Sequence, residues 1–176
     1  MKYLLLIGLL LGQLSQAQTT PTASARQAQS SGAVRYFVQG FYTWYAPKAA
    51  SVGELPMAMV LHQKASWFSA ELSRKLRADW LAQSTAKEEV DALDFDPFLN
   101  SQDPDPFYRV VSVTSKGQRY LVAVHRVVAG KVEKQRAVTA EVAGEAGHWY
   151  FVNFQYPGGY NLLGVLAALQ KSRDSP

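Results

Sequence analysis

The most informative feature of this 176-residue chain is a change in the spacing of its apolar residues around residues 93–107. Before this stretch, apolar side chains recur at three- and four-residue steps, which is the period of an amphipathic helix. After it they alternate, which is the period of a half-buried strand. Helices followed by consecutive strands, rather than the two in alternation, predict an α+β domain.

The part of the chain before this stretch is predicted to be helical. A first helix is expected over residues 33–46, ended by Pro47. A second helical region is expected from Pro56 to about Ser84, with a break near residues 66–69, because Ser69 is a good N-cap and an acidic residue follows in the next turn. Residues 85–93 are predicted to form one further short helix. The apolar stripe of the first helix consists of Val34, Phe37, Val38, Phe41, Trp44 and Tyr45.

The part of the chain after the stretch is predicted to be a sheet. Four strands are expected, followed by a closing helix that Asn161 can cap. The turns between the strands are short, as at Ala129-Gly130, and short turns join antiparallel neighbours. The predicted fold is therefore N-terminal helices packed on a four-stranded antiparallel meander with a short C-terminal helix. The strands are placed at residues 107–114, 119–128, 131–142 and 148–156, and the closing helix at 162–171.

The beginning of the chain is typical of an exported protein. Residues 1–17 show a basic start at Lys2, a short apolar run and small residues at Ser15-Gln16-Ala17, the pattern of a signal peptide cleaved after Ala17. The apolar run is too short to span a bilayer. Residues 18–32 have no apolar period and are predicted to be a flexible leader, so one domain is expected over residues 33–171. We therefore expect a periplasmic or secreted protein with no transmembrane segment in the mature chain.

The charges are segregated along the chain. The formal net charge is +4, which does not by itself amount to a nucleic-acid-binding surface. Residues 88–105 contain seven carboxylates and no lysine or arginine, whereas the strand region is rich in basic residues. Two interpretations stay open. The charges form a mixed, solvated surface, or sheet arginines such as Arg126 and Arg136 clamp the aspartates of the stretch.

The common catalytic and metal-binding motifs do not occur in the sequence. There is no nucleophile elbow, phosphate-binding loop, dinucleotide fingerprint or zinc-protease helix, and the three histidines lie far apart. A calcium loop that started at Asp94 would need glycine where Leu99 stands. A nonstandard calcium site stays an alternative to the interpretation we favour, in which the aspartates bond backbone amides and Phe95 or Phe98 plugs the core. No catalytic residue, metal or cofactor is assigned.

Two segments, taken in order, resemble the bacterial domain-of-unknown-function family 3828. They are Phe41-Tyr-Thr-Trp-Tyr45 in the first predicted helix and Asp96-Pro-Phe-Leu-Asn-Ser-Gln-Asp103 before the first strand. The resemblance covers roughly residues 33–170. It implies an exported protein with a nuclear transport factor 2-like or cystatin-like fold, in which helices pack against a curved antiparallel sheet. It brings no assigned activity.

Two functions compete on this basis. The favoured one is an exported binding module for an unknown small molecule or an exported or periplasmic protein, the latter including inhibitor- or immunity-type proteins. The alternative is an isomerase- or dehydratase-like enzyme that uses a cavity aspartate as base and a tyrosine as oxyanion donor. The alternative depends on fold analogy alone. The candidate ligand- or partner-binding residues are Tyr42, Tyr45, Asp94, Asp96, Phe98, Gln102 and Asp103.

Overall fold

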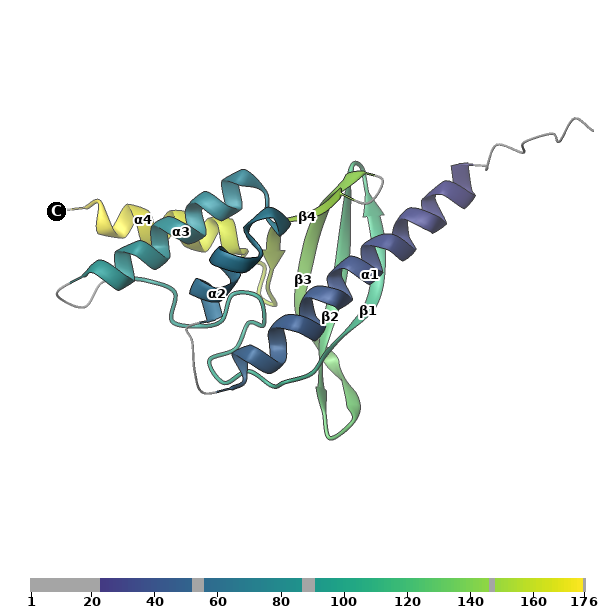
Figure 1. Cartoon of the computed structure of the whole chain (residues 1–176), viewed down its shortest axis with the longest axis horizontal. Helices are drawn as coiled ribbons and strands as arrows, with labels where there is room; N and C mark the ends of the chain where they lie inside the picture. Colours follow the sequence, from purple (N-terminus) through teal and green to yellow (C-terminus); the bar gives the residue numbers. More distant parts are fainter. Residues whose placement is uncertain (1–22, 52–55, 87–90, 146–147, 176) are drawn as a thin grey trace, which may run out of the picture.

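The computed structural model describes residues 23–51, 56–86, 91–145 and 148–175, and it shows an α+β fold (Figure 1). The predicted signal peptide and its cleavage site lie outside the described residues. No helix within the described ranges is long and apolar enough to cross a membrane. In chain order the elements are α1 (Ala23–Ala49), α2 (Pro56–Gln63), the short 3-10 helix η1 (Ala65–Trp67), α3 (Ala70–Thr85), β1 (Tyr108–Lys116), β2 (Arg119–Val128), β3 (Lys131–Glu145), β4 (His148–Gln155) and α4 (Leu162–Arg173).

The four strands form one antiparallel sheet in the order β1-β2-β3-β4, so the predicted meander is confirmed. The hairpin between β2 and β3 turns through Ala129 and Gly130, whose φ angles are 47° and 76°. Left-handed values at both positions match the twist of the flanking strands. Shifts of register interrupt all three strand pairs and add to the curvature of the sheet.

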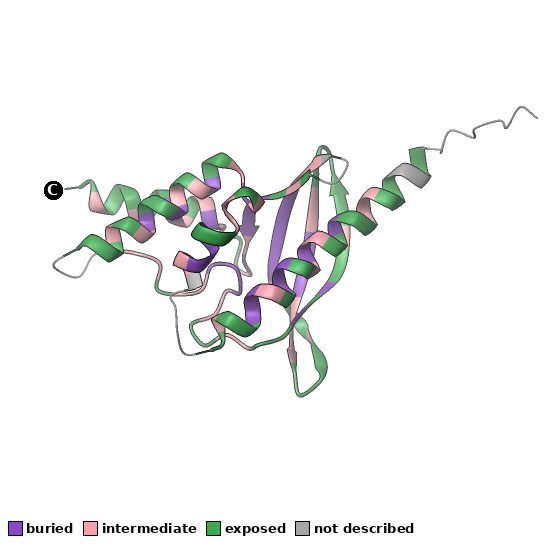
Figure 2. Ribbon diagram, viewed as in Figure 1, coloured by how far each residue is buried: buried purple, intermediate pink, exposed green. Residues whose placement is uncertain are grey.

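The core lies between α1 and one face of the sheet (Figure 2). The predicted stripe of α1 is confirmed: Val34, Val38, Phe41 and Tyr45 are buried, while Phe37 and Trp44 are half-buried. Alternate residues of the central strands meet this stripe, as the period of two requires. The sheet contributes Val122, Val124, Val138, Ala140, Val142, Phe151 and Phe154 to the same core.

The remaining helices pack beside the sheet at its β4 edge, where α3 and α4 lie next to each other (Figure 1). Both predicted N-caps are confirmed. The backbone N–H of Leu72 donates to Ser69 Oγ at 3.2 Å, and that of Gly164 donates to Asn161 Oδ1 at 3.0 Å. These caps satisfy backbone donors that would otherwise lack a partner at a helix start.

Three predictions about the helices are wrong. Helix α1 begins at Ala23, well before the predicted start at residue 33. Apolar periodicity reports burial, whereas this alanine- and glutamine-containing stretch is helical without an apolar period. Helix α1 also continues past Pro47 to Ala49. Of the helix predicted over residues 85–93, residues 87–90 lie outside the described residues, and residues 91–93 are not helical.

Side chains of α1 cover part of the exposed edge of β1. The amide of Gln39 accepts from the N–H of Val110 at 2.9 Å and donates to the C=O of Tyr108 at 3.1 Å. The guanidinium of Arg35 donates to the C=O of Val110 at 2.7 Å and of Val111 at 3.1 Å. Gln39 thus makes the two hydrogen bonds that a neighbouring strand would make, which protects the edge from pairing with another chain.

Candidate functional site

Residues 93–107, which we call the connecting loop, join α3 to β1 and contain a tight closed turn. The carboxylate of Asp96 organises it: Oδ1 accepts from the N–H groups of Phe98 at 2.9 Å and Leu99 at 3.0 Å. Asn100 N–H donates to the C=O of Asp96 at 2.8 Å, and Asp96 N–H donates to the C=O of Ser101 at 2.8 Å. An aspartate followed by proline suits this geometry, since Pro97 has no N–H to leave unpaired.

Three tyrosines from distant parts of the chain hold this turn in place. Tyr42 donates to the C=O of Phe98 at 2.8 Å, Tyr45 to Asp96 Oδ2 at 2.5 Å, and Tyr156 to the C=O of Pro97 at 2.9 Å. The Phe98 side chain is fully buried and packs edge-on against Phe41. The interpretation of Phe98 as a plug of the core is confirmed, and Asp96 bonds backbone amides as predicted.

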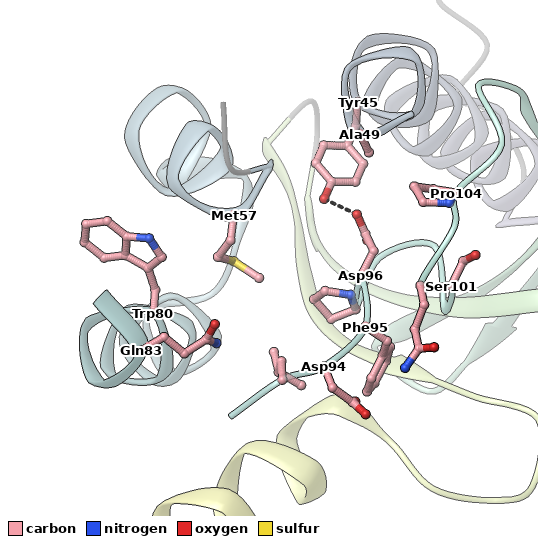
Figure 3. A pocket seen from close by; sticks show the side chains of 13 residues that line it. Tyr45, Ala49, Met57, Trp80, Gln83, Asp94, Phe95, Asp96, Ser101 and Pro104 are labelled. Atoms are coloured by element: carbon pink, nitrogen blue, oxygen red, sulfur yellow. Dashed lines mark hydrogen bonds between the residues drawn. The ribbon is translucent and has the colours of Figure 1, made fainter. Parts of the chain in front are cut away.

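A pocket of about 440 Å³ lies beside the turn, between the end of α1, helices α2 and α3, and the connecting loop (Figure 3). Trp80 and Met57 form one side of it, and Tyr45 and Asp96 lie opposite. Most of the lining is apolar or aromatic, with a few amide, hydroxyl and carboxylate groups. The lining consists of Tyr45, Ala49, Met57, Trp80, Gln83, Leu93, Asp94, Phe95, Asp96, Pro97, Ser101, Gln102 and Pro104.

The electrostatic feature of the pocket is Asp96. Burial raises the pKa of its carboxyl to about 6, against the opposing effect of hydrogen bonds from Tyr45, Phe98 and Leu99. Burial, reinforced by the nearby Asp96 charge, also raises the pKa of the Tyr45 hydroxyl well above its ordinary value. Asp96 therefore titrates close to neutral pH, while Tyr45 stays a protonated donor to it.

The structure brings four of the seven candidate residues to this pocket and places three elsewhere. Tyr45, Asp94, Asp96 and Gln102 line it. Tyr42 and Phe98 belong to the buried core beneath the loop, and Asp103 is exposed. Sequence reasoning missed the opposite wall, formed by Met57, Trp80 and Gln83. The sequence holds no signal that would have found Trp80, since it falls on the apolar stripe of its helix and only the structure shows that it is half-buried.

One of the predicted arginine clamps exists in the structure. Arg126 of β2 lies 3.1 Å from Asp105 of the connecting loop and 3.0 Å from Glu133 of β3. The other named arginine, Arg136, is exposed. The clamp fixes the end of the loop where it enters β1, at some distance in sequence from the pocket-lining aspartates.

The described residues contain no group of three or more His, Asp or Glu side chains that could hold a metal ion. Comparisons of the chain with protein-family models, curated proteins and solved structures find no match. The resemblance to family 3828 and the nuclear transport factor 2-like or cystatin-like label therefore stay predictions.

Proposed function

We propose that this protein is a binding module for a small organic molecule, which occupies the pocket between the connecting loop and helices α1, α2 and α3. The observation that carries the proposal is the convergence of three helices and the loop on one pocket of about 440 Å³. Ligand pockets in proteins have volumes of roughly 300–1,000 Å³ and combine apolar walls with a few polar groups. This pocket meets both conditions.

The rigid support of the loop is what a binding site requires. Three tyrosine hydroxyls and the buried ring of Phe98 hold the turn that carries Asp96. A preorganised wall lowers the entropic cost of binding, because the loop does not have to be ordered by the ligand. Together with the signal peptide predicted for residues 1–17, this gives an exported binding protein. A protein partner, of the inhibitor or immunity type, is the alternative within the same class.

The enzyme alternative has one observation in its favour, which is the contact of Asp96 with Tyr45 at the pocket wall. The same contact argues for binding. Tyr45 donates its only hydroxyl proton to Asp96, so it is not free to stabilise an oxyanion. Asp96 in turn accepts three hydrogen bonds that hold the fold. A general base must reach a substrate proton at about 2.6–3.2 Å and needs a separate group for the oxyanion, whereas the tyrosine that would supply this group is already bonded to Asp96.

A pocket-filling variant tests the proposal. Ala49 lies at the end of α1 and lines the pocket, so Ala49→Leu should reduce its volume. The matched control is Ala78→Leu, which adds the same side chain to an exposed position of α3. A fragment collection is screened by thermal shift and by intrinsic tryptophan fluorescence, to which Trp80 in the pocket wall contributes.

We expect fragments that bind the wild type and the Ala78→Leu variant and lose at least about tenfold in affinity with Ala49→Leu, equivalent to about 1.4 kcal/mol. Thermal melting of both variants shows whether each is folded. If fragments bind but are indifferent to Ala49→Leu, the site is elsewhere. If no fragment binds the wild type, the protein is not a small-molecule binding module.

A further inference from the structure

The pocket has an unusual charge for this protein. The chain as a whole carries a formal charge of +4. Nevertheless the 13 residues that line the pocket include two carboxylates, Asp94 and Asp96, and no lysine, arginine or histidine. The negative charge of the pocket lining therefore does not follow from the net positive charge of the chain. A pocket whose fixed charges are all negative favours a cationic ligand.

The carboxylate of Asp96 still has acceptor capacity on the side of the pocket. An ionised carboxylate offers about four lone-pair sites. Two hydrogen bonds go to Oδ1, from Phe98 and Leu99, and one goes to Oδ2, from Tyr45. Oδ2 can therefore accept one more hydrogen bond, and Asp96 keeps some exposed surface where it lines the pocket, although most of it is buried. A charged N–H donor makes the strongest bond to such an oxygen.

The walls of the pocket suit the apolar part of a cationic ligand. Trp80 and Tyr45 face the pocket from opposite sides, and Phe95 belongs to the loop between them (Figure 3). Aromatic faces bury apolar groups and also attract organic cations through their π electrons. Met57 and Ala49 complete the apolar surface. The aliphatic or aromatic part of a ligand can thus contact these side chains while its ammonium group reaches Asp96.

We infer that the ligand of this pocket is an organic amine, a primary or secondary ammonium group on an apolar body, with the ammonium bound to Asp96. The inference depends on the proposed function and specifies its ligand class. Asp94, which is exposed and also lines the pocket, adds to the attraction from its rim.

The test compares three probes of one shape and different charge. They are phenethylamine, which is cationic at neutral pH, phenethyl alcohol, which is neutral, and hydrocinnamate, which is anionic. Binding to the full mature chain is measured by isothermal titration calorimetry from about pH 5 to about pH 8. We expect phenethylamine to bind at least about tenfold more tightly than phenethyl alcohol at the upper end of this range, as a charge-assisted hydrogen bond implies. Hydrocinnamate should bind least.

The pH profile and two variants identify the group responsible. Affinity for the amine should fall below about pH 6 as Asp96 becomes protonated, while affinity for the alcohol should stay constant. The titratable groups around Asp96 are the carboxyl of Asp94 in the same lining and the buried hydroxyls of Tyr42, Tyr45, Tyr108 and Tyr156, which burial keeps protonated by raising their pKa values. Asp96→Asn should remove the preference for the amine, and Asp94→Asn, at an exposed position, should weaken it without disturbing the turn.

The outcomes separate this inference from the proposed function. If the alcohol or the carboxylate binds as tightly as the amine, at a site sensitive to Ala49→Leu, the ligand class is wrong and the binding function stands. A preference for the amine that survives in Asp96→Asn would also overturn the inference. If none of the three probes binds while fragments from the screen do, the amine assignment again fails alone.

Discussion

Asp96 is the residue on which both the structure and the proposed function depend. One of its oxygens holds two backbone amides of the turn, and the other accepts from Tyr45 beside the pocket. The hydrogen bonds of Asp96 to the turn could be expected from the sequence. An aspartate before proline is biased towards an extended backbone, from which its carboxylate reaches the next amides. The hydrogen bond from Tyr45 could not be expected, since Tyr45 and Asp96 are 51 positions apart in the sequence.

Phe98 should contribute most to stability among the loop residues. Its side chain is fully buried against Phe41, Tyr45, Phe68 and Phe154. Phe98→Ala is expected to lower the free energy of unfolding by about 3–5 kcal/mol, through lost burial and the cavity left behind. Urea melts measure the loss. The control is Asp103→Ala at an exposed position of the same loop, and an equal loss for both variants would contradict this account.

Asp96 should also make stability depend on pH. Its pKa is about 6 in the folded protein and 3.8 in the unfolded chain, so the folded state holds the proton more tightly. Stability from this group is complete below about pH 4 and is lost as the pH rises through about 6. The difference corresponds to about 3 kcal/mol. Urea melts at several pH values measure it, and Asp96→Asn should lack this component. An Asp96→Asn variant with the wild-type slope between these pH values would exclude Asp96 as its source.

At the level of elements, one side chain of α1 makes the hydrogen bonds that a neighbouring strand would make with the edge of β1. Gln39 satisfies both Val110 N–H and Tyr108 C=O. Gln39→Ala should cost about 1–3 kcal/mol, since it leaves a partly buried amide without an acceptor. Gln39→Glu keeps the acceptor and should cost less. Hydrogen exchange at the Val110 amide distinguishes them: we expect faster exchange in Gln39→Ala and near wild-type protection in Gln39→Glu. Unchanged protection in both would refute the role of Gln39.

The elements were largely predictable, and each exception has a physical reason. Elements whose apolar residues repeat with a period of two or 3.6 are predicted well, as with β2 at Arg119–Val128. The start of α3 is predicted by a different signal, the N-cap Ser69. The start of α1 is not predictable from periodicity, because residues 23–32 have no apolar period. Pro47 was expected to end α1, but a proline in the last turn costs only one hydrogen bond near a helix end.

At the level of the whole molecule, a buried ion pair joins α3, α4 and the segment that leads into the connecting loop. Asp79 of α3 is 2% exposed and lies 2.8 Å from Arg173 at the end of α4. The other oxygen of Asp79 accepts from Leu93 N–H at 3.3 Å. Leu93 also lines the pocket, so Asp79, which the ion pair holds in place, fixes the backbone of a pocket residue.

Arg173→Ala should therefore destabilise the protein strongly. It leaves the Asp79 carboxylate buried without its cation, at a cost of about 3–5 kcal/mol. The loss should shrink in an Asp79→Asn background, where no buried charge is left behind. Urea melts of the two single variants and the double variant give this coupling, and Lys171→Ala at an exposed position of α4 is the control. Additive losses would mean that the two side chains do not interact.

The pocket itself was not predictable from the sequence. Four of its residues are candidates from the sequence: Asp94, Asp96 and Gln102, which are polar residues of a proline-rich loop, and Tyr45 of the first helix. Its other wall comes from α2 and α3, and no local pattern says which helix of a bundle faces a given loop. Packing at long range decides this, through contacts such as those of the three tyrosines with the turn.

The most direct test of the pocket and of its proposed ligand is an NMR titration of the Asp96 carboxyl carbon, without and with saturating phenethylamine. Without the amine, we expect a midpoint near pH 6, because burial raises the pKa of this carboxyl more than its hydrogen bonds lower it. With the amine, the midpoint should move to lower pH, since a bound cation stabilises the carboxylate. A midpoint close to the ordinary value of 3.8, unchanged by the amine, would contradict both the geometry of the site and the ligand assigned to it.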